Sequence, residues 1–196
     1  MTGPTSSPRD PRLSRSILII LAMSLGLVGY YGPWVAHKAA GLVIMGLDLA
    51  EYVKFLPQVA SGQFAIRREV FYLPLMTASI SASLFASRRF LPTWMRWTLA
   101  LLAIPLALAM LPPAWSPAIL GLAEYRTQVL LIAICLLLIP GVAFLSHLPD
   151  RVVLLIVGTL ALIAALGPMW AFIQVRPAIA EAYRQPPRLG RHRPKP

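Results

Sequence analysis

The sequence is poor in charge and nearly devoid of cysteine. Charged side chains make up 13% of its 196 residues, and Cys135, the only cysteine, lies inside an apolar run. One cysteine excludes an internal disulfide and argues against a metal site built on thiolates. With 58% hydrophobic residues and a mean hydropathy of +0.70, the chain is more apolar than a water-soluble domain can accommodate. The composition therefore predicts a protein whose main solvent is the lipid bilayer.

Among the charged residues, acidic side chains are scarcer than basic ones. Seven Asp and Glu stand against eighteen Lys and Arg, which gives a formal net charge of +11. In a soluble protein this balance would suggest binding to nucleic acid. Here most basic residues flank apolar runs, where they anchor helices and set their orientation. We therefore expect anionic lipid, rather than nucleic acid, at the basic tails.

Five apolar runs reach or approach the roughly 20 residues that an α-helix needs to cross a bilayer. We predict an all-α, polytopic transmembrane bundle with a membrane domain over residues 16–175, a basic tail over 1–15 and a Pro/Arg-rich tail over 176–196. Both tails have too few apolar residues to fold, the second beyond its start. The predicted spans lie near residues 17–35, 71–87, 95–111, 128–148 and 152–175.

The first apolar run has a competing interpretation. Arg9, Arg12 and Arg15 precede it, as basic residues precede the apolar region of a signal peptide. No convincing small-x-small cleavage site follows, so we predict an uncleaved membrane anchor.

The ends of the runs carry residues that favour the level of the lipid headgroups. Tryptophan rings are amphipathic and concentrate at the membrane interface, and arginines there interact with anionic headgroups. The predicted headgroup anchors are Arg67, Arg68, Arg88, Arg89, Trp34, Trp94, Trp97 and Trp115.

The run near residues 71–87 carries two neighbouring rows of small residues at helical spacing. Rows of small side chains let helix backbones approach each other closely in a membrane. We therefore expect this helix to pack centrally and to contact a partner subunit. The rows that form this predicted helix-packing face are Ala78, Ala82 and Ala86, and beside them Ser79, Ser83 and Ser87.

Residues 39–59 resemble a further span but carry Asp48, Glu51 and Lys54. Each charge at mid-bilayer costs roughly 2.5–3.5 kcal/mol, which the neighbouring apolar side chains could hardly offset. The spacing of the apolar residues predicts an amphipathic helix near residues 40–57 that lies at the interface. In the alternative, a re-entrant helix directs its acids into the bundle interior, where these three residues form an ion, proton or partner site.

The number of spans depends on this segment. Five spans place the two basic tails on opposite sides of the membrane, whereas a sixth would bring both to the cytoplasmic side that basic residues prefer. We choose five spans because each buried charge is a direct energetic penalty, while the preference of basic residues is statistical. The side of the membrane that we expect to bind a partner then carries Asp48, Glu51, Glu69, Glu124 and Glu181.

The sequence contains no recognisable catalytic constellation. His37, His147 and His192 are far apart, and motifs for a zinc protease, a serine hydrolase or a phosphate-binding loop are absent. We predict no catalytic, metal or cofactor site. The leading hypothesis is a noncatalytic accessory or scaffolding subunit in a bacterial cytoplasmic membrane, which binds another membrane protein or a second copy of itself. The alternative is a small transporter or channel component in which Asp48 and Glu51 line a polar path, and a membrane enzyme ranks third.

Overall fold

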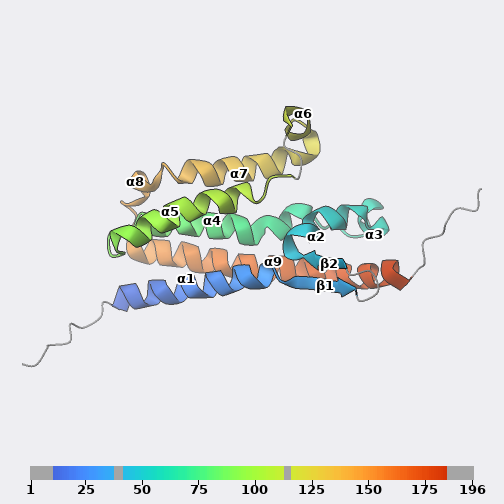
Figure 1. The fold of residues 1–196 in the computed structure, drawn as a ribbon, viewed down its shortest axis with the longest axis horizontal. Helices are drawn as coiled ribbons and strands as arrows, with labels where there is room; N and C mark the ends of the chain where they lie inside the picture. Colours follow the sequence, from blue (N-terminus) through green and yellow to red (C-terminus); the bar gives the residue numbers. More distant parts are fainter. Residues whose placement is uncertain (1–10, 38–41, 113–115, 185–196) are drawn as a thin grey trace, which may run out of the picture.

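The computed structural model describes residues 11–37, 42–112 and 116–184, and its architecture is mostly helical. Five helices lie side by side along the long axis of the molecule (Figure 1). Of these, α1, α5 and α9 run in one direction, and α4 and α7 run in the opposite direction. Their bounds are α1 (Pro11–Tyr30), α4 (Leu73–Ala86), α5 (Thr93–Leu108), α7 (Arg126–Leu138) and α9 (Asp150–Arg184).

A group of short elements, which we call the cap, covers one end of this bundle (Figure 1). The cap comprises the described residues of 31–72 and 116–125. Its strands, β1 (Pro33–His37) and β2 (Leu42–Met45), pair antiparallel. The other elements are α2 (Gly46–Tyr52), η1 (Val53–Phe55), α3 (Pro57–Ala60), η2 (Arg68–Tyr72), α6 (Pro117–Leu120) and η3 (Ala123–Tyr125).

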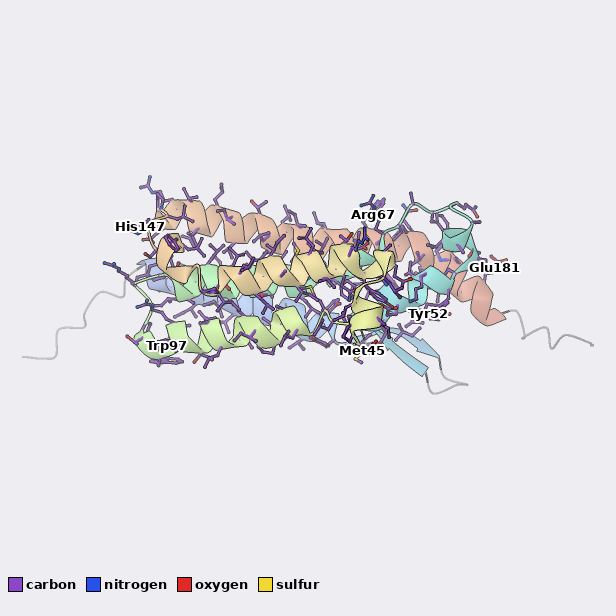
Figure 2. All side chains as sticks on the ribbon, turned by 90° about the horizontal axis from the view of Figure 1, so that it is seen from above. Met45, Tyr52, Arg67, Trp97, His147 and Glu181 are labelled. Atoms are coloured by element: carbon purple, nitrogen blue, oxygen red, sulfur yellow. The ribbon has the colours of Figure 1, made fainter. Side chains whose placement is uncertain are left out.

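The two ends of the bundle differ in content. Tyr52 and Glu181 lie at the cap end, whereas Trp97 and His147 lie at the opposite end (Figure 2). That opposite end holds the connection between α4 and α5 and the short helix α8 (Val142–Leu145). Because α9 is longer than the other helices, its last turns continue past them and pack on the cap.

The central helix is α4. Its side chains are largely buried because α5 and α9 pack against it. The hydroxyl of Ser79 donates to the carbonyl oxygen of Ala103 on α5 at 2.8 Å, which requires a close approach of the two helices. The predicted central packing is therefore present, but the predicted contact of this face with a partner is wrong, because its residues are buried inside the chain. These buried residues are Ala78, Ala82, Ala86, Ser79 and Ser83.

Two helical segments of the described chain are long and apolar enough to cross a membrane, Arg68–Ala86 and Asp150–Glu181. The first is enclosed by neighbouring helices, and the second is mostly exposed. Shorter apolar helices cover Ile17–Tyr30 and Thr93–Leu108. Large apolar side chains stand exposed on the outer helices, among them Leu21 on α1, Leu101 on α5, Leu137 on α7 and Leu155 on α9.

Proline sets two helix ends that differ from the predicted ones. The first predicted span ends at Tyr30, because Pro33 begins a strand shortly afterwards. The fourth ends at Leu138, two residues before Pro140. Proline lacks an N–H group and disfavours helical geometry in the residue before it. The fifth predicted span instead continues as one helix to Arg184.

The amphipathic helix predicted over residues 40–57 is wrong in its first half. Strand β2 occupies that part, since two β-branched residues favour an extended chain that pairs with β1. Helix α2 begins only at Gly46, where Asp48 Oδ2 accepts the backbone N–H of Met45 at 3.0 Å. No described element of the cap runs the length of the bundle as a sixth helix (Figure 1).

The predicted tails overlap with helices. Helix α1 begins at Pro11 and so includes the end of the N-terminal tail, and α9 includes the start of the C-terminal one. The remaining tail residues, 1–10 and 185–196, and Trp115 lie outside the described residues.

Candidate functional site

The charged residues of the cap converge on Arg68, whose side chain is only 9% exposed. Its Nη1 lies 3.3 Å from Glu124 Oε1 and 3.5 Å from Glu51 Oε1. Its Nη2 donates to the carbonyl oxygen of Glu124, and the guanidinium stacks over the ring of Tyr125, 4.5 Å from the centroid. One planar cation with several donors can serve all these groups at once. Arg68 thereby joins η2, which carries it, to α2 and η3.

Lys54 completes this cluster. Its ammonium lies 2.7 Å from Glu51 Oε2 and 3.4 Å from Glu124 Oε1. The hydrogen bond to Glu51 raises the pKa of Lys54, so the ammonium stays protonated at neutral pH. The pKa of Glu124 is lowered, chiefly by a hydrogen bond with Tyr125 and then by the charge of Lys54. The Glu124 carboxylate is therefore ionised, and Lys54 and Arg68 both lie beside it and beside Glu51.

A polar branch leads from this cluster into the bundle. The hydroxyl of Tyr72 donates to Glu51 Oε1 at 3.2 Å, and the side chain of Gln128 lies close to that hydroxyl. The amide of Gln128 in turn donates to the backbone carbonyl of Met110. Because Gln128 is almost fully buried, the branch ends in the interior of the bundle.

The structure brings only part of the predicted site together. Glu51 and Lys54 are in contact, as their spacing on a helix allows. Asp48 does not join them, because its carboxylate binds the backbone at the start of α2. The alternative site of Asp48, Glu51 and Lys54 is therefore not assembled as a unit, and Glu51 instead shares Arg68 with Glu124.

Two of the predicted headgroup anchors have other roles. Arg88 is only 2% exposed, and its guanidinium donates to the carbonyl oxygens of Leu145 and, at 2.7 Å, of Leu148. Its Nη1 also lies 3.5 Å from Asp150 Oδ1, so it joins the end of α4 to the start of α9. The prediction is wrong for Arg88 and Arg68, because their guanidinium groups are used inside the chain.

The other predicted anchors within the described residues are exposed or half-buried. Arg67, Arg89, Trp94 and Trp97 are exposed, and their role at headgroups stays a prediction. Trp34 is half-buried: its Nε1 donates to the carbonyl oxygen of Gly29 at 3.2 Å, and its ring meets that of Phe172 edge-on. It therefore links the end of α1 with α9.

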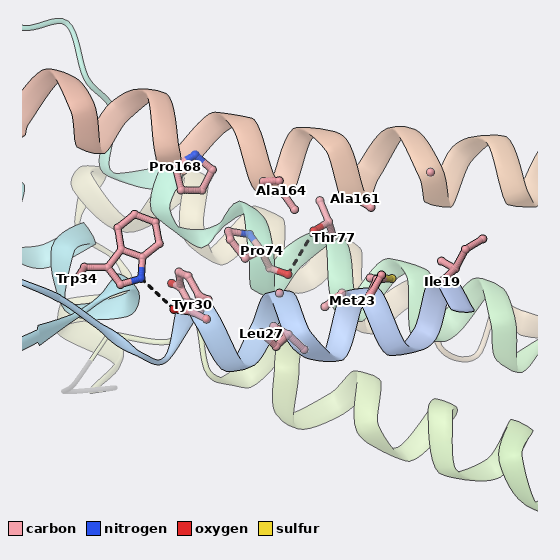
Figure 3. A pocket seen from close by; sticks show the side chains of 16 residues that line it. Ile19, Met23, Leu27, Tyr30, Trp34, Pro74, Thr77, Ala161, Ala164 and Pro168 are labelled. Carbon is pink, nitrogen blue, oxygen red and sulfur yellow. Dashed lines mark hydrogen bonds between the residues drawn. The ribbon is translucent and has the colours of Figure 1, made fainter. Parts of the chain in front are cut away.

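A second feature is a cavity of about 500 Å³ between α1 and α9, which we call the groove (Figure 3). The two helices form its walls, and α4 forms its floor with Pro74, Thr77 and Ala78. Tyr30 and Trp34 lie at its cap end, and Ile19 lies toward the other end (Figure 3). Most wall residues are small: Ala22, Gly26 and Gly29 on α1, and Gly158, Ala161, Ala164 and Ala165 on α9.

The few polar side chains that line the groove are already hydrogen bonded within the chain. The hydroxyl of Tyr30 donates to the carbonyl oxygen of Phe71 at 2.7 Å, and that of Thr77 donates to the carbonyl oxygen of Leu73 at 2.7 Å. The indole of Trp34 is bonded as well. The groove therefore offers mainly hydrocarbon to an occupant.

The cap also exposes two large apolar side chains beside its charged cluster. Phe55 is 74% exposed, and its ring centroid lies 5.2 Å from Lys54 Nζ. Leu122 is 51% exposed and lies two residues before Glu124. Exposed apolar side chains rimmed by fixed polar groups are typical of interaction surfaces.

Sequence reasoning did not identify Tyr72, Tyr125 and Gln128 as parts of the cluster, because each is distant from Glu51 along the chain. It also did not identify the groove. A signal for the groove was present, since small residues recur at helical spacing in the first and last apolar runs, as they do in the second.

The cluster and the groove are therefore the two features from which a function can be argued. Within the described residues, no group of three His, Cys, Asp or Glu side chains is placed to hold a metal ion. Comparison with known proteins assigns a function to neither feature, since the chain matches no protein-family model, no curated protein and no solved structure.

Proposed function

We propose that the chain is a multi-pass protein of a bacterial cytoplasmic membrane and a noncatalytic accessory subunit of a membrane complex. Its five spans are α1, α4, α5, α7 and α9. The alternating directions of these helices and the apolar side chains exposed on the outer four support this proposal. Under this arrangement the cap and the last turns of α9 lie on one side of the membrane.

The observation that carries the accessory role is the pair of exposed apolar side chains, Phe55 and Leu122, on the cap. Arg68 and Lys54 hold the segments that bear them in place through ion pairs. A rigid surface loses little conformational entropy when a partner binds, so its apolar side chains contribute more fully to affinity. Such side chains at the centre of an interface typically account for most of its binding energy.

Truncation of these side chains tests the role. We expect the wild-type chain to migrate as a larger assembly on blue-native electrophoresis and to be crosslinked to a partner in membranes, and the Phe55→Ala/Leu122→Ala variant to migrate as a monomer. The matched control is Phe144→Ala, because Phe144 is 82% exposed on α8 at the opposite end of the bundle. A wild-type chain that is monomeric in both membranes and mild detergent would contradict the proposal.

Cysteine accessibility tests the five spans separately. With Cys135 replaced, we expect a membrane-impermeant reagent to label cysteines at Ser61, Ser116 and Arg191 from one side and cysteines at Ser7 and His147 from the other. Six spans would instead place Ser7 and Arg191 on the same side.

The polar branch favours a second candidate function, a small transporter or channel component. Glu51, Tyr72 and Gln128 form a row of polar side chains from the cap into the bundle, in which Tyr72 donates to Glu51 and Gln128 donates to the carbonyl oxygen of Met110. Polar groups inside a membrane bundle often mark a route for ions or protons. If this function holds, Glu51→Gln lowers ion or proton flux in proteoliposomes, whereas Asp48→Asn, outside the branch, does not. Equal flux in both variants and the wild type would exclude it.

A further inference from the structure

We propose that the groove between α1 and α9 binds one acyl chain of an anionic phospholipid, with the headgroup at the end away from the cap. The inference rests on the proposed membrane insertion of the chain. It does not depend on a partner at the cap, so the two proposals can fail independently.

The glycines of the groove leave space that the chain itself does not use. A Cβ atom added at Gly26, Gly29 or Gly158 would meet no atom within 4 Å. By contrast, a Cβ at Gly46 would lie 2.6 Å from the Tyr30 ring, and one at Gly167 would lie 2.9 Å from a methyl group of Leu73. Glycine weakens a helix relative to alanine. Since internal packing does not require the groove glycines, their small size is best explained by an occupant from outside the chain.

The dimensions of the groove favour a single hydrocarbon chain over a helix. Its α1 wall runs from Ile19 to Tyr30, which corresponds to about 16 Å at the rise of an α-helix. The cavity volume of about 500 Å³ is small beside the roughly 1,300 Å³ or more that a helix 10–12 Å in diameter would occupy over the same length. It therefore suits a single hydrocarbon chain better than a whole partner helix.

The chemistry of the lining agrees with this occupant. The hydroxyls of Tyr30 and Thr77 and the indole of Trp34 donate to backbone carbonyls of the chain. An occupant therefore needs no polar groups inside the groove, and a polar occupant would lose its hydrogen bonds with water. The groove is also bordered by the apolar surface of α1 and α9, so a lipid can enter it from the bilayer.

The distribution of charge gives the lipid its orientation. Because α1 and α9 run in the same direction, their first turns flank the same end of the groove (Figure 1). Arg12 and Arg15 lie in the first turns of α1, and exposed Arg151 is the second residue of α9. The acidic residue that the structure describes at this end, Asp150, is in contact with Arg88. Basic residues at a membrane surface attract anionic headgroups, so the phosphate lies here and the methyl end points toward Trp34.

Leucine side chains introduced into the groove test whether a phospholipid occupies it. The full-length chain is reconstituted in vesicles of phosphatidylglycerol and phosphatidylcholine, extracted in mild detergent and measured by native mass spectrometry. We expect the wild type to retain about one phospholipid, since the groove has the volume of a site for one small ligand, and Gly26→Leu/Gly158→Leu to lose it. The control, Ser24→Leu/Thr159→Leu, places leucine at exposed positions of the same helices outside the groove and should retain the lipid.

Several outcomes would overturn the inference. The filled variant could retain as much phospholipid as the wild type, or the wild type could retain only detergent, free fatty acid or a second polypeptide. Unchanged thermal unfolding of the filled variant shows that loss of lipid is not loss of fold. A monomer that keeps its lipid contradicts the accessory function alone, whereas a chain that stays dissolved and folded without detergent removes both proposals.

Removal of a basic side chain at the end of the groove away from the cap tests the position of the headgroup. Arg151→Gln should lower the preference for phosphatidylglycerol over phosphatidylcholine about fivefold, which corresponds to roughly 1 kcal/mol for one basic residue near a membrane surface. Arg67→Gln, an exposed arginine at the cap end, is the control and should leave the preference unchanged. Equal effects of the two variants, or no preference in the wild type, would overturn the orientation.

Discussion

The contact between α4 and α5 and the contact between α1 and α9 are both lined by small residues, yet the first is closed and the second is open. Ser79 on α4 reaches the backbone of Ala103 on α5, whereas a Cβ atom added at Gly158 on α9 would meet no atom within 4 Å. At the cap end, the ring of Trp34 fills the space between the end of α1, where its Nε1 donates to Gly29, and Phe172 of α9, which it meets edge-on. Small residues therefore permit close packing, but the larger side chains around them decide whether it occurs.

The largest effect is expected where α4 ends, at Arg88. Arg88→Ala removes the donor to the carbonyls of Leu145 and Leu148 and leaves Asp150 without this cation, so we expect a loss of about 3–5 kcal/mol in the free energy of unfolding. Denaturant-induced unfolding in mild detergent measures it. Arg89→Ala, at the exposed neighbouring position, should change stability by less than about 0.5 kcal/mol. Similar losses of unfolding free energy in both variants would show that the burial of Arg88 does not make it more important for stability than Arg89.

The closed contact should not tolerate added volume. Ser79→Leu places a branched side chain against Ala103 and removes a hydrogen bond, so we expect a loss of about 1–3 kcal/mol or more. The same change in the open contact, Gly158→Leu, should leave the unfolding midpoint unchanged or raised. If both variants unfold alike, the two contacts do not differ in the way described.

Substitution of a tightly packed glycine and of a groove glycine should have opposite effects on stability. Gly46→Ala brings a methyl group against the ring and backbone of Tyr30, and we expect a loss of about 1–3 kcal/mol. Gly26→Ala meets no atom and replaces a weak helix former, so it should stabilise the chain by up to about 1 kcal/mol. Thermal unfolding of the two variants side by side should give shifts of opposite sign, and shifts of the same sign would contradict the comparison.

The smallest effect is expected for the partly exposed ion pairs of Lys54 and Glu124 on the cap, because apolar packing beneath them also joins its segments. The pKa of Glu124 is lowered, so its contribution is present above its ordinary value of about 4.3 and is lost as the pH falls through the lowered pKa. The pKa of Lys54 is raised, so its contribution is present below its ordinary value of about 10.4 and is lost as the pH rises through the raised pKa. Each loss should stay below about 1 kcal/mol.

The pH dependence of thermal unfolding measures these contributions. Glu124→Gln should remove part of the acid-side loss and leave the alkaline side nearly intact. If the Glu124→Gln variant lost as much thermal stability at low pH as the wild type, Glu124 would not be the source of that loss.

The local sequence pattern predicts where the helices of the bundle lie along the chain, but not which helices and side chains contact each other. α4 and α5 begin and end within a few residues of the predicted spans, because apolar runs bounded by arginine, tryptophan and proline are local signals. The pairing of β1 with β2 is not predictable in this way, because the apolar residues from Leu42 to Leu56 have the spacing of an amphipathic helix. Arg68 and Arg88 cannot be told from lipid anchors by sequence, because an arginine beside an apolar run has the same sequence context whether it faces lipid or a carbonyl group.

By itself, the sequence determined a mostly helical chain with apolar segments of near-membrane length and basic residues between them, since composition and periodicity act residue by residue along the chain. Only the tertiary structure decided which small residues pack and which line the groove, and which charges pair on the cap. Those outcomes depend on contacts between residues far apart in the chain, such as Arg68 with Glu124 and Trp34 with Phe172. A helix carries information about its own faces, whereas the distance to the next helix is set by every side chain between them.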